Sequence, residues 1–142
     1  MKSLVRFSML ALACGFICDS SSGCTEPTPQ VKRYGSVIGI KKESIPEYKR
    51  LHADCWPGVL KMIEECHIRN YSIYLAEVEP DEFYLFSYFE YTGDDFEADM
   101  AAMAADEETL RWWDECKPCL DPVEDLPPGE VWAPMQSVFF HP

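Results

Sequence analysis

Three ring-bearing side chains, Tyr48, His52 and Trp56, recur at a spacing of four residues. Residues four apart on an α-helix lie one above the other, so the spacing predicts a single stripe on one helix face. Two aromatic rings beside an imidazole form a flat surface that suits a sugar, and the imidazole titrates near neutral pH. The stripe is therefore a candidate acid–base site, although aromatic residues at this spacing also suit an ordinary hydrophobic core.

The composition restricts the partners of this chain. Its 142 residues have room for one domain. The 25 acidic and 12 basic residues give a formal net charge of −13. Such a surface repels phosphate backbones, so we expect no nucleic-acid partner, whereas a neutral ligand such as a sugar is not repelled. No stretch approaches the roughly 18 consecutive apolar residues of a membrane-spanning helix.

Residues 1–24 have the pattern of an export signal. Lys2 and Arg6 give a positively charged start, residues 7–17 form an apolar run, and the small polar stretch Ser20–Gly23 follows. We therefore expect the protein to be exported. The alternative is a mis-assigned start codon, under which the extension has no role and the domain is cytoplasmic.

A cysteine follows the predicted cleavage point, and Cys24 would then be the first residue of the mature chain. This position resembles the lipidated cysteine of bacterial lipoproteins, although Ser21 stands where that pattern usually has leucine. The pattern predicts a membrane tether through a lipid on Cys24. Residues 25–32 contain two prolines and no apolar periodicity, so we expect a linker there and a domain at residues 33–142.

The candidate stripe lies in a predicted helix. Ser44 and Glu47 match the capping box that starts many helices. We expect the helix to run through the stripe to Pro57, where it kinks or restarts because proline cannot donate within a helix. It then continues over residues 59–66. A kink at this point would open a gap next to His52.

Three stretches have the composition of β-strands: residues 34–40, 68–75 and 83–91. The third is apolar on both of its faces. One face has Tyr84, Phe86 and Tyr88, and the other has Phe83, Leu85 and Phe89. Helices can cover only one of these faces, so we expect the other to pack on a second copy of the sheet in a homodimer.

The C-terminal third completes the predicted fold. A second helix is predicted to begin at Asp94. Asp106 is predicted to cap a further helical piece that ends near Cys116. Prolines within residues 118–128 impose a loop of about 15 residues, long enough to suggest a functional lid. Residues 135–140 form the last predicted strand. The order of strands and helices is that of an α+β, ferredoxin-like βαββαβ domain.

Several short motifs, in one order, resemble the L-rhamnose mutarotase family from about residue 33 to the C-terminus. They are Leu51-His52, Trp56-Pro57, Arg69-Asn70-Tyr71-Ser72-Ile73-Tyr74-Leu75, Phe86-Ser87-Tyr88-Phe89-Glu90-Tyr91 and Arg111-Trp112-Trp113. The resemblance implies a ferredoxin-like domain that dimerises face to face as a dimeric α/β barrel. It also implies an isomerase that interconverts the α and β anomers of L-rhamnose.

The resemblance also assigns roles to individual residues. It implies that His52 is the proton donor and that Tyr48, Tyr71, Trp112 and Trp113 hold the sugar. Adjacent helical residues point about 100° apart, so we expect only one tryptophan to face the sugar fully, with the other supporting it. The resemblance requires no metal and no other cofactor.

Cys116-Lys-Pro-Cys119 has the spacing of some redox motifs. Cys116 is expected at the end of a helix, where the dipole would raise its pKa, so a thioredoxin-like role is not favoured. Cys55 and Cys66 are too far apart in sequence to complete a paired zinc motif. In an exported domain a structural disulfide is the expected use of these cysteines.

Two other classes of function share some of these features. A non-catalytic sugar-binding lipoprotein could use the same aromatic pocket but would not need the titrating His52. A ferredoxin-like dimeric oxygenase would share the fold but not the set of His52, Trp112 and Trp113. Within the mutarotase interpretation the physiological sugar stays open, because a related deoxysugar such as fucose would make similar contacts.

Overall fold

The computed structural model describes residues 31–123, 126 and 130–142. The predicted signal of residues 1–24, its Cys24 and the linker up to residue 30 lie outside the described residues. The elements are β1 (Lys32–Ile40), the short 3-10 helix η1 (Lys42–Ser44), α1 (Ile45–Ala53), α2 (Pro57–Glu65), β2 (Ile68–Glu79), β3 (Glu82–Tyr91), α3 (Phe96–Ala105), α4 (Glu107–Cys116), the 3-10 helix η2 (Lys117–Cys119), β4 (Leu120–Asp121) and β5 (Ala133–Met135). None of the helices within residues 31–123 is long and apolar enough to cross a bilayer.

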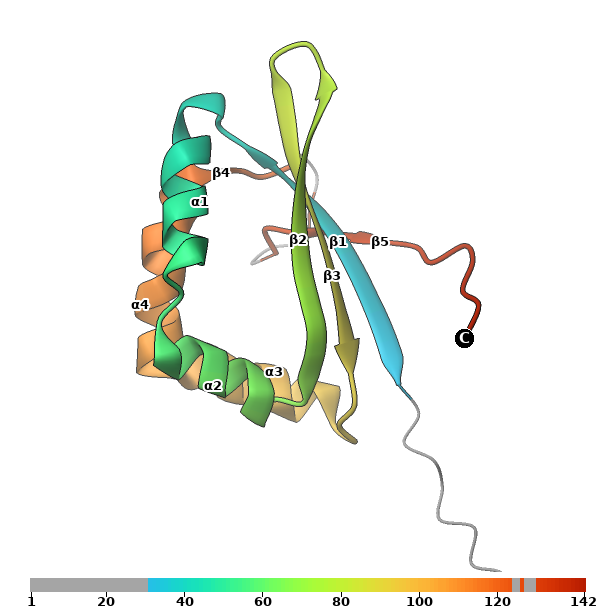
Figure 1. The fold of residues 1–142 in the computed structure, drawn as a ribbon. Coiled ribbons are helices and arrows are strands. Elements are labelled where there is room, and N and C mark those ends of the chain that lie inside the picture. Colours follow the sequence, from blue (N-terminus) through green and yellow to red (C-terminus); the bar gives the residue numbers. More distant parts are fainter. Residues whose placement is uncertain (1–30, 124–125, 127–129) are drawn as a thin grey trace, which may run out of the picture.

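The sheet has the strand order β2-β3-β1-β4, and all of its pairs are antiparallel. β5 pairs with the same edge of β1 as β4, so two short strands share the position of the fourth strand. Figure 1 shows the four α-helices gathered on one side of the sheet. The α+β, ferredoxin-like arrangement predicted from the sequence is confirmed.

The predicted break at Pro57 divides the first helical region into two helices. α1 ends at Ala53 and α2 begins at Pro57, because the residue before a proline is disfavoured in the helical conformation and Trp56 is extended. The predicted continuation of the first helix through Trp56 is therefore wrong. The predicted cap is also wrong, since Ser44 has helical backbone angles at the end of η1 and makes no capping hydrogen bond.

The later helices begin with capping aspartates. Asp106 caps α4, as predicted, by accepting from the backbone N–H of Thr109 at 2.7 Å. The cap of α3 is Asp95, not the predicted Asp94, and it accepts from the backbone N–H of Ala98 at 3.1 Å. Both aspartates satisfy an N–H group that has no partner in the first helical turn.

β2 contains a bulge that changes which face its side chains meet. Arg69 pairs with Glu90 and Ser72 pairs with Tyr88, so Asn70 and Tyr71 together oppose a single residue of β3. Asn70 has a φ of 51°, in the left-handed region that asparagine tolerates better than most residues. The bulge therefore shifts the alternation of the strand by one residue.

The sheet has one face covered by helices and one that carries exposed aromatic rings. Leu85 and Ser87 of β3 are buried beneath the helices. Tyr84 and Phe86 alternate with them and point to the opposite face, where Tyr74, paired with Phe86, is 65 % exposed. The predicted two-sided character of the third strand is therefore present in the described chain.

The C-terminal segment differs from its predicted form. β5 covers residues 133–135, whereas residues 135–140 were predicted to be a strand. Beyond Met135 the chain leaves β1, and Val138 and Phe139 are 91 % and 82 % exposed. Strand propensity depends on a partner edge and a surface to cover, and beyond Met135 this apolar run pairs with no strand of the described chain. Phe140 packs instead against the guanidinium of Arg33, 3.6 Å from its ring centroid. The predicted lid begins as η2 and β4, and residues 127 and 128 lie outside the described residues.

Candidate active site

Tyr48 and His52 lie on successive turns of α1, and their ring centroids are 4.1 Å apart. The Nδ1 atom of His52 is 2.9 Å from the backbone carbonyl oxygen of Tyr48. A carbonyl oxygen can only accept, so Nδ1 carries the hydrogen and donates it. In the neutral ring the other nitrogen, Nε2, is then the proton acceptor. The helix itself therefore fixes the tautomer of the imidazole.

The protein environment sets the charge of both groups. Burial lowers the pKa of His52 below its ordinary value of 6.5, although the hydrogen bond to the Tyr48 carbonyl opposes this shift. Burial also raises the pKa of Tyr48 above its ordinary range, and the nearby Tyr71 hydroxyl adds to this effect. At neutral pH His52 is thus an uncharged base beside a protonated phenol.

Trp112 of α4 closes the other side of the imidazole. Its ring centroid is 5.5 Å from that of His52, in an edge-to-face arrangement with 66° between the planes. Trp56 makes a similar contact with Trp112, at 5.5 Å and 67°. The predicted stripe of three rings on one helix is therefore corrected. Trp56 lies beyond the end of α1 and reaches the group through Trp112.

Tyr71 reaches the same region from the sheet because of the bulge in β2. Although 44 % of the residue is exposed, its hydroxyl lies inward near the thiols of Cys116 and Cys55. Burial of the hydroxyl, with these thiols nearby, raises the pKa of Tyr71 to about 12. Tyr71 is therefore a second protonated phenol close to Tyr48.

Trp113 has different surroundings from its neighbour in sequence. It is half-buried and packs against the small core cluster formed by Cys66, Ile68 and Met103, as well as against the main core. Trp112, by contrast, is only 5 % exposed and contacts His52 directly. Of the five predicted site residues, the structure thus brings Tyr48, His52, Trp112 and Tyr71 together, whereas Trp113 lies between the main core and the cluster of Cys66, Ile68 and Met103.

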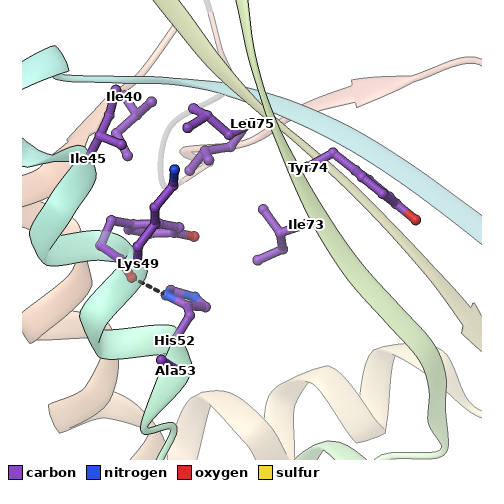
Figure 2. A pocket seen from close by; sticks show the side chains of 10 residues that line it. Ile40, Ile45, Lys49, His52, Ala53, Ile73, Tyr74 and Leu75 are labelled. Carbon is purple, nitrogen blue, oxygen red and sulfur yellow. Dashed lines mark hydrogen bonds between the residues drawn. The ribbon is translucent and has the colours of Figure 1, made fainter.

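A cavity of about 480 Å³ lies between α1 and the sheet, on the side of His52 that faces β2 (Figure 2). Its wall is mainly apolar, and its polar residues are Tyr48, Lys49 and His52 of α1 and Tyr74 of β2. The lining residues are Ile40, Ile45, Tyr48, Lys49, His52, Ala53, Ile73, Tyr74, Leu75 and Leu85. The cavity thus lies next to His52, where a gap was predicted, although Trp56 does not line it.

The residues that line the cavity differ from the site residues predicted from the sequence. Tyr71, Trp112 and Trp113 do not line it, whereas Lys49 does and was missed by sequence reasoning. The available signal was helical spacing, since Ile45, Lys49 and His52 follow the same face at intervals of four and three residues.

The cysteines have no role in this arrangement. Cys55, Cys66, Cys116 and Cys119 are free thiols, so the expected structural disulfide is not formed among them. Burial, together with the nearby Cys119 thiol, raises the pKa of Cys116 to about 12, which makes it a poor nucleophile. Within residues 31–123, 126 and 130–142, no three metal-ligating side chains gather closely enough to hold an ion.

The family model described as "L-rhamnose mutarotase" matches residues 33–141. The chain belongs to the L-rhamnose mutarotase family. The match covers every helix and all but the first residue of the sheet, so the cavity and the group of rings around His52 are features of a mutarotase-family domain.

Individual relatives agree with the family model. The L-rhamnose mutarotase of Lactiplantibacillus plantarum is 30 % identical over 107 residues, which are 75 % of this chain and 95 % of the relative. The L-rhamnose mutarotase of Tolumonas auensis is also 30 % identical, over 76 % of this chain and 96 % of the relative. The mutarotase domain thus accounts for nearly the whole length of these relatives.

A solved structure supports the fold. The crystal structure of the L-rhamnose mutarotase FA22100 from Formosa agariphila aligns with a TM-score of 0.59 and 22 % identity. The alignment covers 78 % of this chain and 99 % of that one. The mutarotase-family fold is therefore shared along the whole length of the solved protein.

Proposed function

We propose that this protein interconverts the α and β anomers of L-rhamnose, or of a closely related 6-deoxyhexose. The observation that carries the proposal is the state of His52, an uncharged imidazole whose Nδ1 is held by the Tyr48 carbonyl and which lines a cavity. Its family relatives bear the name of this activity. A protein that only bound sugar would have no need of a titrating group at this point.

The proposed reaction moves one proton within the sugar. Nε2 of His52 accepts the proton of the anomeric hydroxyl and delivers it to the ring oxygen as the bond between C1 and that oxygen breaks. The aldehyde then rotates about the C1–C2 bond. The reverse transfers close the ring on the opposite face of the aldehyde, and the imidazole returns to its starting state.

The surrounding residues supply binding and orientation in this proposal. Tyr48 and Tyr71 both keep their phenolic protons at neutral pH. Tyr48 lines the cavity and can donate to a sugar oxygen there, whereas Tyr71 lies beside Tyr48 without lining the cavity, so its contact with the sugar stays a prediction. The apolar wall of the cavity suits the C–H faces and the C6 methyl of a deoxysugar. Trp112 holds the imidazole in place through its edge-to-face contact, and Trp113 supports α4 by packing against both core clusters.

The test is anomer exchange measured by saturation-transfer NMR on L-rhamnose and other 6-deoxyhexoses. Replacing His52 by alanine should lower the catalysed exchange by at least about 10²-fold, the usual scale for losing an acid–base group. His67→Ala is the matched control, because His67 is exposed and does not line the cavity. Its Nδ1 atom pairs with a carboxylate oxygen of Asp99 at 2.9 Å. Unchanged exchange in a folded His52→Ala variant would contradict the assignment of His52 as the acid–base group. Sugar binding without catalysed exchange in the wild type would indicate a non-catalytic sugar-binding protein.

We also propose that the active form is a homodimer. The sheet face with Tyr74, Tyr84, Phe86 and Tyr88 has no helix of the described chain upon it, and an exposed aromatic surface of this kind favours association. A second copy of the same face would cover it. Light scattering at micromolar concentration should give twice the mass of the chain, and Phe86→Arg should shift it towards the monomer. A stable wild-type monomer would contradict the proposal.

We propose that the protein is exported and is tethered to a membrane by a lipid on Cys24. The support is the charged and apolar start of the chain and the linker that would hold the domain clear of a membrane surface. Mass spectrometry of the native protein distinguishes the alternatives. A chain that starts at Cys24 with added acyl mass supports the tether. A chain that keeps Met1, or starts within the linker, favours a cytoplasmic protein.

A further inference from the structure

One basic side chain that lines the cavity, Lys49, is exposed to solvent and has no place in the acid–base chemistry described above. Lys49 lies on α1 between Tyr48 and His52 in the sequence and lines the cavity with them. Figure 2 shows its amine in the space between α1 and the sheet, on the side towards Leu75. The wall opposite it is built of aliphatic residues of β1, β2 and β3, namely Ile40, Ile73, Leu75 and Leu85.

Lys49 also differs from three other cations of the helical segments, which are bound to carboxylates of their own helix turns. Arg50 is bound to Glu47 at 2.6 Å, Lys61 to Glu65 at 3.0 Å and Lys117 to Asp114 at 2.9 Å. Lys49 forms no ion pair or hydrogen bond with any residue that the structure describes. A chain with 25 acidic residues has many carboxylates to offer, and Lys49 is not placed against one.

The chemistry of an ammonium group restricts what Lys49 can bind. It has three N–H donors and no acceptor, so its partners are oxygen atoms. Lys49 precedes His52 by three positions, which corresponds to a rise of about 4.5 Å along the helix axis. If His52 acts at the anomeric carbon, a donor displaced by this distance meets the part of the sugar ring remote from C1.

We propose that Lys49 determines substrate specificity by donating a hydrogen bond to the C3 or the C4 hydroxyl of the sugar. The inference rests on the proposed mutarotase function and adds a binding residue to it. Lys49 takes no part in proton transfer. It fixes the orientation of the ring so that the anomeric hydroxyl and the ring oxygen both lie within reach of His52.

The first experiment compares Lys49→Met with Arg50→Met in the full chain. Methionine keeps an unbranched side chain of similar length and removes only the charge and the donors. A hydrogen bond from a charged group predicts that Lys49→Met lowers kcat/KM for L-rhamnose by about 10- to 150-fold. Arg50→Met, which breaks only an exposed ion pair on the other face of α1, should leave kcat/KM within about twofold.

The second experiment identifies the sugar hydroxyl. Wild type and Lys49→Met are compared on L-rhamnose analogues in which the hydroxyl at C2, C3 or C4 is replaced by hydrogen. For either the C3 or the C4 analogue the two proteins should have equal kcat/KM, because the partner of Lys49 is already absent. The C2 analogue should keep the full difference. The acid limb of the pH profile, which reports His52, should be the same in both proteins.

The outcomes separate this inference from the function on which it rests. Wild-type protein without catalysed exchange on any 6-deoxyhexose overturns the proposed function, and the assignment of Lys49 falls with it. Active wild type with an equally active Lys49→Met overturns the Lys49 assignment alone. An equal loss on all three analogues does the same, since it would indicate a structural effect of the substitution on the cavity.

Discussion

Replacement of Trp112 by alanine tests whether this ring both supports the fold and keeps His52 uncharged. The side chain is 5 % exposed and contacts His52 and Trp56. Truncation of a buried tryptophan to alanine costs about 3–5 kcal/mol in the free energy of unfolding. A domain of about 110 residues has an unfolding entropy of about 0.23 kcal/mol/K, so the melting temperature should fall by about 13–22 °C.

The same substitution should change the titration of His52. Burial is what lowers the pKa of His52, and removal of the indole admits water to one side of the imidazole. The pKa should therefore rise towards 6.5. The chain has three histidines, so NMR can follow each ring through a pH titration, with His52→Ala identifying the signal.

Trp112→Phe and Trp113→Phe complete the test. Trp112→Phe should be folded at 25 °C and should show the same direction of shift in the pKa of His52, to a smaller extent. Trp113→Phe should leave the pKa of His52 unchanged, because Trp112 and not Trp113 is the indole that contacts the imidazole. A folded Trp112→Ala protein in which His52 titrates as in the wild type would refute the reasoning.

Three further predictions concern acidity, capping and close packing. Since burial lowers the pKa of His52, the acid limb of kcat/KM should have its midpoint below pH 6.5. The contribution of the neutral imidazole to stability should be fully present above pH 6.5 and should be lost as the pH falls through the lowered pKa. The difference in melting temperature between wild type and His52→Ala, followed across this pH range, measures that loss. Asp106→Ala should cost about 1 kcal/mol of stability because a capping bond is lost, while Ser44→Ala should cost almost nothing in the same denaturant titration. Gly39→Ala should cost about 1–3 kcal/mol, because the added methyl group would meet the backbone oxygen of Asp121 and force β4 away from β1.

The order of the elements could be predicted from the sequence because it depends on local signals. The strand at residues 83–91, the break at Pro57 and the cap at Asp106 each depend on a few neighbouring residues. The failures have a different origin. Residues 135–140 have the composition of a strand, but whether they pair depends on an edge of β1 that the local sequence does not describe. Ser44 loses its cap because the 3-10 turn before α1 already has helical angles.

The candidate site was predictable to the extent that its residues have distinctive types. Tyr48, His52 and Trp112 are rings whose spacing and motifs point to one region, and they are in contact. Lys49 could not be selected in this way, since a lysine on an amphipathic helix is normally a solvent-facing residue. Only the position of the sheet opposite α1 shows that this part of the helix faces a cavity.

Because of the bulge at Asn70, the side chains of β2 meet the correct faces of the sheet only if the strand keeps its number of residues as well as their types. Ile68 on one side of it and Tyr71 on the other both turn towards the helix layer, although an unbroken strand would send them to opposite faces. Deleting one residue here would turn either the buried isoleucine or the phenol outward. An alignment that opens a gap between residues 69 and 72 therefore pairs chains that differ in which of these two side chains meets the helices. A graft of the rings around His52 onto another scaffold must likewise carry the extra residue with it.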